Sequence, residues 1–177
     1  MSPSESRPQP QLLLGALRVL FLGDVCGSRG GGGGAGTRRV LPALDGIRRE
    51  AQIVFGDMHA KATAEKQAMG WFLDGRVSGV FGSHTHVQTA DEAILDGGTA
   101  YINDSGMCGS FDSVLGMNKD QSLRRMIEMV PVRLRPAADD VRINGVWVDV
   151  EPASGRALAI GRPAQSVAFV RNQAPAG

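Results

Sequence analysis

The sequence lacks several features that would place a protein in a class at once. Of its 177 residues only 2 are cysteines, Cys26 and Cys108, too few for a disulfide framework, which predicts reduced thiols in a cytoplasmic protein. Its 19 basic and 18 acidic residues leave a formal net charge of +1, which gives no basic footprint for nucleic acid or a membrane surface. Aromatic residues make up only 5% while glycines number 24, which suits an α/β protein with many tight loops.

Long apolar runs are also scarce. Residues 12–22 are apolar but interrupted by Arg18, and they are too few to span a bilayer, which takes about 20 residues. Because no small-residue cleavage site follows, we expect no signal peptide. We predict instead a buried strand over residues 17–22, which begins a single domain over residues 17–162. A disordered extension over residues 1–16 precedes that domain, since its first part is polar and rich in proline and serine.

The histidines mark what is present. All 3 follow apolar segments within a short part of the chain: His59, His84 and His86. The run Ile53–Phe55 leads to the first and the run Val77–Phe81 to the other two. Residues 63–73 between them have helical spacing, with Ala64, Ala68, Met69, Phe72 and Leu73 on the predicted apolar face. This pattern predicts a strand, a helix and a strand, and the crevice beyond the carboxyl ends of parallel strands is where ligands bind.

A metal site is one explanation of this placement. Imidazole is a common metal ligand, and His84 and His86 are one residue apart, so they can point the same way from an extended backbone. Histidines placed by accident on the surface or in the core are the alternative. Asp24 likewise stands after a predicted strand, where a carboxylate could join the imidazoles around Zn, Mn or Fe. It could equally cap a helix, and both interpretations stay open.

A glycine run follows this first strand. Gly30–Gly34, extended by Gly36, invites comparison with phosphate-binding loops, but no Gly-Lys-Ser/Thr ending is present, so the P-loop interpretation fails. The dinucleotide fingerprint is matched only trivially by a run of glycines. We interpret the segment as low-complexity filler that should be the most mobile internal region. Residues 38–50 then read as helical, with the charged face Arg48, Arg49 and Glu50.

The second half of the chain predicts mostly β structure. A hairpin is expected over residues 93–102, followed by a long polar loop over residues 103–117, which is typical of functional or disordered segments. Asn118 and Gln121 have capping-box spacing for a helix over residues 119–129, which Pro131 ends. A β-meander should follow, with an Asn144-Gly145 turn and strands over residues 132–135, 141–143, 146–150 and 156–160. Residues 163–177 are predicted to be a loose tail.

These residues together resemble a known family, the bacterial YmdB-type metallophosphoesterases of the calcineurin-like phosphoesterase superfamily. The similar segments are Leu20-Phe21-Leu22-Gly23-Asp24, Asp57-Met58-His59-Ala60 with Glu65-Lys66, Gly82-Ser83-His84-Thr85-His86-Val87-Gln88-Thr89-Ala90-Asp91-Glu92 and Asp104-Ser105-Gly106-Met107. The resemblance implies an α/β sandwich of the calcineurin-like type. It also implies hydrolysis of small-molecule phosphodiesters, including cyclic nucleotides, by water bridging two metal ions, often Fe or Mn. Asp24 and His86 match ligands of one metal, and His59 and His84 match ligands of the other.

Departures from the family pattern qualify this expectation. The family's Asn-Gly-Glu-Asn block, whose Glu bridges the metals, and its Gly-Asn-His block are both missing, so the resemblance implies an internal deletion with its junction near residues 30–50. Lys61 stands where the family usually carries an acidic residue. We therefore expect at most one bound metal and hydrolysis orders of magnitude below that of an uninterrupted relative. Uncovered sheet edges predict marginal stability or a homo-oligomer. A non-catalytic remnant that serves as a binding or structural domain is the alternative.

Overall fold

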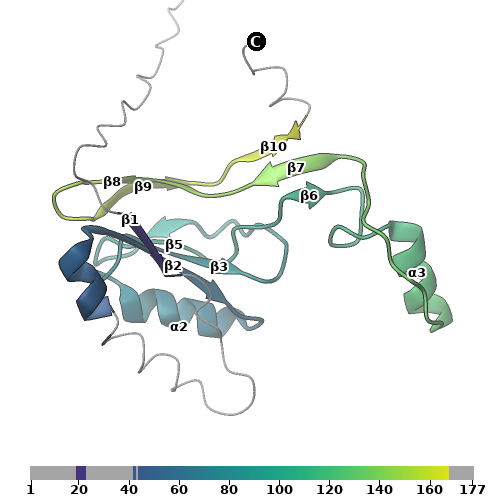
Figure 1. Cartoon of the computed structure of the whole chain (residues 1–177), viewed down its shortest axis with the longest axis horizontal. Helices are drawn as coiled ribbons and strands as arrows, with labels where there is room; N and C mark the ends of the chain where they lie inside the picture. Colours follow the sequence, from purple (N-terminus) through teal and green to yellow (C-terminus); the bar gives the residue numbers. More distant parts are fainter. Residues whose placement is uncertain (1–18, 23–41, 43, 168–177) are drawn as a thin grey trace, which may run out of the picture.

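A five-stranded sheet forms the centre of the fold in the computed structural model, which describes residues 19–22, 42 and 44–167 (Figure 1). The strand order is β1-β2-β3-β5-β4. Four strands are parallel: β1 (Val19–Leu22), β2 (Ile53–His59), β3 (Gly79–Ser83) and β5 (Ala100–Ile102). The short β4 (Ala93–Ile94) closes the edge as the antiparallel partner of β5. The predicted α/β class and its parallel strands are therefore confirmed.

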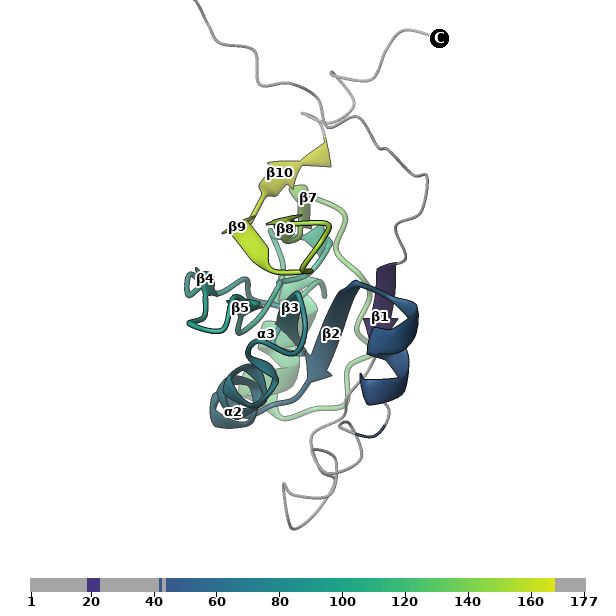
Figure 2. The ribbon, with the colours of Figure 1, turned by 90° about the vertical axis from the view of Figure 1, so that its left-hand side faces the viewer.

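The helix α2 (Thr63–Leu73) covers one face of this sheet, and the pair β8 (Trp147–Val150) and β9 (Ala157–Gly161) lies on the other (Figure 2). The buried residues of α2 are Lys66, Met69, Gly70 and Leu73, spaced to form one helical stripe. Gly70 permits close packing, because a Cβ there would lie 2.5 Å from the Tyr101 ring. The predicted stripe is correct for Met69 and Leu73, whereas Ala64 and Ala68 are exposed.

The core lies between α2 and the central strands. It contains Val54, Met58, Val80 and Tyr101 from the sheet, with Met69 and Leu73 from the helix. Strands buried on both faces are expected to be apolar along their length, which explains why β2 opens with the buried pair Ile53 and Val54. Residues 44–50 are helical, as predicted for this part of residues 38–50, and Leu44 joins the core.

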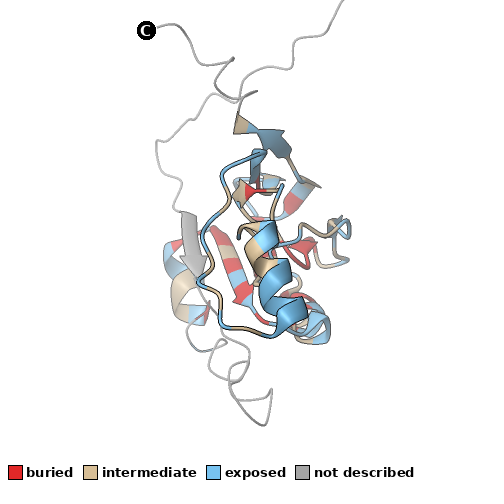
Figure 3. Ribbon diagram, turned by 90° about the vertical axis from the view of Figure 1, so that its right-hand side faces the viewer, coloured by how far each residue is buried: buried red, intermediate tan, exposed pale blue. Residues whose placement is uncertain are grey.

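A three-stranded antiparallel sheet extends the molecule away from this core. Its order is β10-β7-β6, formed by β10 (Ala164–Ser166), β7 (Val141–Asn144) and β6 (Gly109–Ser110). Next to it α3 (Lys119–Glu128) stands apart from the central sheet (Figure 1), and none of its residues is buried (Figure 3). Asn118 caps α3 as predicted, because its side chain accepts a hydrogen bond from the Gln121 N–H. The Gln121 side chain instead accepts from the Arg135 N–H, so the capping box is half formed.

The predicted meander is wrong in its connections. Strands β7 and β8 belong to different sheets, so Asn144-Gly145 is not the turn of a hairpin, although β8 and β9 do pair around Ser154-Gly155. Residues 132–135 form no strand. Within the segment predicted as a loose tail, Ala164–Ser166 form β10 and pair with β7. The predicted Asn144-Gly145 turn is also not formed, since residues 145–146 make neither a turn nor a bend, and the partner of each strand is set by contacts distant in sequence.

Several predictions fall on residues that the structure does not describe. They concern the extension over residues 1–16, the ligand Asp24, the mobile glycines Gly30–Gly36, Cys26 and the end of the chain after residue 167. Cys108 is a free thiol. In the described ranges, no helix combines the length and the apolar character needed to cross a membrane.

Candidate functional site at the carboxyl edge of the parallel sheet

Two predicted ligands meet where the parallel strands end. His59 is the last residue of β2 and lies opposite Ser83, the last residue of β3, in the strand register. His84 follows Ser83 directly, so the parallel pairing brings both imidazoles to one edge of the sheet. The His84 Nδ1 atom lies 2.9 Å from the His59 Nε2 atom, and the two rings meet edge to face. The expectation that His59 and His84 come together is met in the structure.

A chain of hydrogen bonds orients the first of these rings. The Ser83 hydroxyl donates to the Asp57 carboxylate over 2.7 Å, so its oxygen is left to accept from the Nδ1–H of His59 at 3.1 Å. His59 is thereby held as the tautomer whose Nε2 carries a lone pair facing His84. A ligating histidine in metalloproteins commonly makes such a bond from its other ring nitrogen. We refer to Asp57, Ser83, His59 and His84 as the histidine relay.

The charges around His84 favour its neutral form. Partial burial lowers the pKa of the ring, and the positive charges of His59, Lys61, Lys66 and His86 lower it further. A neutral imidazole keeps a lone pair, which is the state that binds a metal. Lys61, the residue that departs from the family pattern, thus contributes to holding His84 uncharged.

The backbone at His84 and His86 is in a conformation that residues with side chains rarely adopt. Their φ angles are 106° and 66°, both in the positive region that favours glycine. Such a conformation costs of order 1–3 kcal/mol and persists only where the surroundings hold it. The contacts of Thr85, the residue between them, hold the backbone in this conformation.

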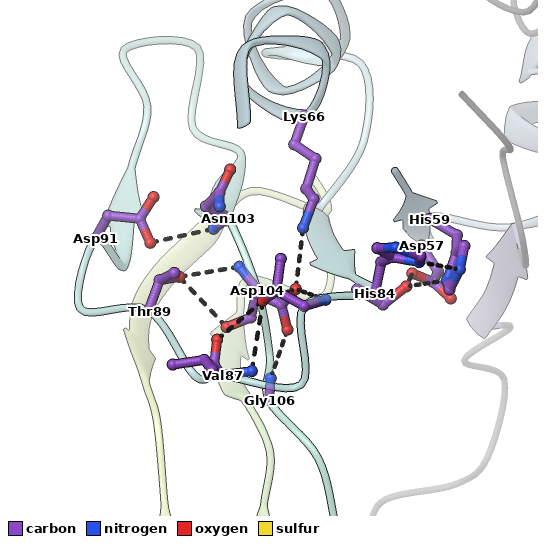
Figure 4. Close-up of polar contacts among 12 residues, drawn as sticks. Asp57, His59, Lys66, His84, Val87, Thr89, Asp91, Asn103, Asp104 and Gly106 are labelled. Atoms are coloured by element: carbon purple, nitrogen blue, oxygen red, sulfur yellow. Dashed lines mark hydrogen bonds and ion pairs between the residues drawn. The ribbon is translucent and has the colours of Figure 1, made fainter. Parts of the chain in front are cut away.

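Thr85 is fastened to a buried ion pair. The carboxylate of Asp104 accepts hydrogen bonds from the Thr85 N–H at 2.9 Å, the Thr85 hydroxyl at 2.7 Å and the Gly106 N–H at 2.9 Å. It also pairs with the Lys66 ammonium at 2.9 Å, and the side chains of Lys66 and Asp104 are both 0% exposed (Figure 4). We call this pair the Lys66–Asp104 clamp. It ties α2 and the segment after β5 to the loop that carries two of the histidines.

The clamp is held in its charged state by these donors. Burial raises the pKa of the Asp104 carboxyl, but the hydrogen bonds from Thr85, Lys66 and Gly106 outweigh it and bring the pKa below its ordinary value. The main chain adds further links, since the Asp104 N–H donates to the Thr89 hydroxyl and the Ser105 N–H to the Gly82 carbonyl. The loop after β3 is therefore anchored along its length.

The other two predicted ligands, His86 and Asp24, are not shown to join the pair of His59 and His84. His86 is exposed, and it is close enough to His84 for its charge to affect the pKa of that ring. Asp24 lies outside the described residues; its strand β1 ends at the same edge as β2, because the two are parallel. Within the part of the chain that the structure describes, no three His, Cys, Asp or Glu side chains gather in a way that could hold a metal ion.

Four residues of the site were not singled out as functional by reasoning from the sequence. Asp57 and Ser83 could have been found, because Asp57 is two residues from His59 on the same face of the strand and Ser83 ends the neighbouring strand. Lys66 and Asp104 are 38 residues apart, and no local pattern announces that they meet. A lysine on the buried stripe of a helix is the one available signal, since lysine is almost never fully buried unless paired.

Comparisons with known proteins agree with this geometry. The sequence model of the family described as YmdB-like protein matches residues 36–162, well over half of the chain. A Bacillus subtilis protein named 2',3'-cyclic-nucleotide 2'-phosphodiesterase is 47% identical over 109 residues, which cover 62% of this chain and 41% of that protein. The chain therefore spans less than half the length of this relative.

Two solved structures share the fold. A hypothetical protein from Thermus thermophilus superposes with a TM-score of 0.72 at 32% identity, covering 83% of this chain and 57% of that one. A structure described as a novel phosphatase from Mycoplasma pneumoniae gives a TM-score of 0.67 at 29% identity, covering 76% and 49%.

Proposed function

The chain belongs to the YmdB-like protein family, and from that membership we propose that it is a metal-dependent phosphoesterase domain acting on small phosphodiesters, with cyclic nucleotides as its substrate class. The Bacillus relative named a 2',3'-cyclic-nucleotide 2'-phosphodiesterase supports this class of substrate, and the Mycoplasma phosphatase supports phosphate ester hydrolysis. The single observation that carries the proposal is the pair of imidazole nitrogens 2.9 Å apart at the carboxyl edge of the sheet.

The donor set fits one metal ion better than two. Two nitrogen ligands of a tetrahedral ion, with bonds of about 2.0–2.1 Å, lie about 3.3 Å apart, close to the separation of His59 Nε2 and His84 Nδ1. These two residues would hold the ion, with His86 and Asp24 as the remaining candidates. A bound metal would supply charge stabilisation at the phosphoryl oxygens and a water of lowered pKa. The Fe or Mn pair that the family resemblance implies would need ligands from the missing blocks.

The protein's own groups then have distinct tasks. The Asp57 carboxylate and the Ser83 hydroxyl fix the orientation and tautomer of His59. The Lys66–Asp104 clamp fixes Thr85 and with it the backbone of His84 and His86. Lys61 adds exposed positive charge near His84, and such charge would favour the approach of a phosphodiester anion.

A non-catalytic domain is the second candidate function. It is favoured by the lack of any three-ligand cluster among residues 19–22, 42 and 44–167, because catalytic metals typically have three protein ligands. In this case the same fold would serve as a binding or structural module that holds one ion or none.

The two candidates are separated by an activity assay on the full chain. Protein loaded with Mn²⁺ or Zn²⁺ is incubated with bis(p-nitrophenyl) phosphate and with 2',3'-cyclic AMP, alongside His84→Ala and an uninterrupted family member. We expect slow turnover that His84→Ala abolishes and that is at least about 100-fold below the intact relative, as the loss of one acid–base group alone predicts. Turnover that persists in His84→Ala would overturn the proposed site, and no turnover with any metal would favour the non-catalytic role. Turnover equal to that of the relative would refute the deletion argument.

A further inference from the structure

A pocket lies at the edge of the parallel sheet opposite to the histidine relay. It is a small hollow with a volume of about 40 Å³ that opens to solvent, and residues just before β2, β3 and β5 line it. Three arginines contribute to its wall: Arg48, Arg76 and Arg156. They come from the helix at residues 44–50, the turn after α2 and the turn between β8 and β9. In Figure 1 that helix and the β8–β9 turn lie at the same end of the molecule, while the arrowhead of β2 points toward the other end.

Two of these arginines are held in place. The Arg156 Nη1 atom donates to the Gly97 carbonyl at 2.8 Å, and the Arg76 guanidinium stacks 5.7 Å from the centre of the Phe72 ring. Arg48 is exposed on its helix. Fixed guanidinium groups lose less freedom when they bind a ligand than free ones do, so the pocket is partly preorganised.

None of the three arginines has a carboxylate partner among the described residues. The ion pairs in this part of the chain involve other cations: Lys66, Lys119, Arg124, Arg142 and Arg162. Two acids bond to other groups of the pocket wall rather than to the arginines. Asp74 accepts from the Gly97 and Thr99 N–H groups, and Glu151 accepts from the Ser154 hydroxyl. Among the described residues the three guanidinium groups thus form no ion pair with a carboxylate, which leaves them able to pair with an anionic ligand.

Glycines shape the wall so that the arginines can approach the main chain. At Gly98, with φ +90°, an added Cβ would lie 2.6 Å from the Arg156 Cζ atom. At Gly155, with φ +74°, it would collide with the Gln52 carbonyl. Side chains at either position would displace a turn or a guanidinium. The shape of the pocket therefore depends on the absence of side chains at Gly98 and Gly155, which both line it.

We propose that this pocket binds the phosphate group of a small molecule. Guanidinium groups match phosphate oxygens with paired hydrogen bonds, and the three in this wall have no carboxylate partner among the described residues. The site is separate from the histidine relay, which lies at the other edge of the sheet, and the proposal does not depend on the hydrolytic activity. Inorganic phosphate and a phosphorylated metabolite share this chemistry, so the test uses both.

The test is a titration of the full chain with inorganic phosphate and, separately, with 5'-AMP. Binding is monitored through the NMR chemical shifts of the backbone amides. Shifts should centre on Gly75, Gly97, Gly98 and Gly155. Arg48→Ala and Arg76→Ala should each weaken binding about tenfold, the effect of one charge-assisted hydrogen bond. Arg124→Ala, which removes an exposed arginine on α3, is the matched control and should change nothing. Tighter binding of 5'-AMP would identify an organic phosphate as the natural source, whereas equal binding would identify the phosphate ion.

Three results would overturn the proposal. They are unchanged affinity in both pocket variants, an equal loss in Arg124→Ala, and shifts confined to residues 84–91 that disappear in His84→Ala. The last would place the phosphate at the histidine relay. Amide spectra of each variant without ligand verify that the exposed substitutions leave the fold intact.

Discussion

The Lys66–Asp104 clamp and the histidine relay, the two parts of the candidate site, differ in solvent exposure. The Lys66–Asp104 clamp is fully buried, and its carboxylate accepts from Lys66, Thr85 and Gly106. The histidine relay lies a few residues away on the solvent side, where His59 is exposed. The clamp has its hydrogen bonds satisfied internally, while the two imidazoles contact each other at the solvent side of the sheet edge. One half fixes geometry and the other half offers chemistry.

This difference in exposure explains why the protein buries an ion pair, Lys66 with Asp104. A buried ion pair adds little net stability compared with apolar residues of similar volume, because both charges lose their hydration. The ion pair instead fixes the position of the loop, since the Asp104 carboxylate accepts hydrogen bonds from both the N–H and the hydroxyl of Thr85. The backbone of His84 and His86 could not hold positive φ angles without such an anchor.

Breaking the clamp on one side should have the largest effect. Lys66→Met keeps the apolar stem but leaves the Asp104 carboxylate buried without its cation, which should lower the free energy of unfolding by about 3–5 kcal/mol. Urea unfolding measures the loss. Arg124→Met, which breaks an exposed ion pair on α3, is the control and should cost far less. Equal losses in the two variants would remove the distinction between clamp and surface.

A substitution that crowds the clamp should cause the second-largest loss of stability. Gly82→Ala places a Cβ against the Asn103 carbonyl and 2.6 Å from the Lys66 Cδ atom, so we expect a loss of about 1–3 kcal/mol or more. Gly56→Ala in the neighbouring strand β2 is a matched control, because a Cβ there meets nothing within 4 Å. The two thermal unfolding curves decide the matter. A Gly82→Ala protein as stable as Gly56→Ala would show that the clamp region tolerates movement.

A smaller change is expected from the relay. Ser83→Ala removes the acceptor of the His59 Nδ1–H and should weaken zinc binding about tenfold, at the low end of the effect of such supporting groups. The unfolding free energy should hardly change, because Ser83 is only half-buried. Calorimetric zinc titration and urea unfolding of the same preparation measure both quantities. A large loss of stability with unchanged zinc affinity would reverse the roles assigned to relay and clamp.

The smallest predicted effect is the response of the clamp to acid. Because the folded pKa of Asp104 lies below its ordinary value of 3.8, its contribution is complete above that pH and is lost as the pH falls toward the folded pKa. Unfolding free energies measured between neutral pH and pH 3 should therefore fall less steeply in Asp104→Asn than in the original protein. Identical slopes would mean that Asp104 is not held ionised by its neighbours.

The same contrast explains which parts of the molecule the sequence could predict. Strand periodicity located β2, α2 and β3, and parallel pairing then brings the residues at their ends together, which is how His59 and His84 were found. The clamp joins Lys66 to a residue far along the chain, and no local signal encodes that contact.

The pairing of β7 with β10 and β6, where a hairpin with β8 was expected, has the same cause. Turn chemistry at Asn144-Gly145 favours a hairpin, but the long-range pairing of β7 prevails and no turn forms at residues 145–146.

Zinc stoichiometry tests the central claim most directly, which is that the paired imidazoles of His59 and His84 form the metal site. Calorimetric titration of the metal-free chain should give a single zinc ion per protein, and both His59→Ala and His84→Ala should abolish this binding. The matched substitution Gln67→Ala, an exposed residue of α2, should leave it unchanged. Two ions per chain, or one ion still bound after both histidine substitutions, would contradict the account.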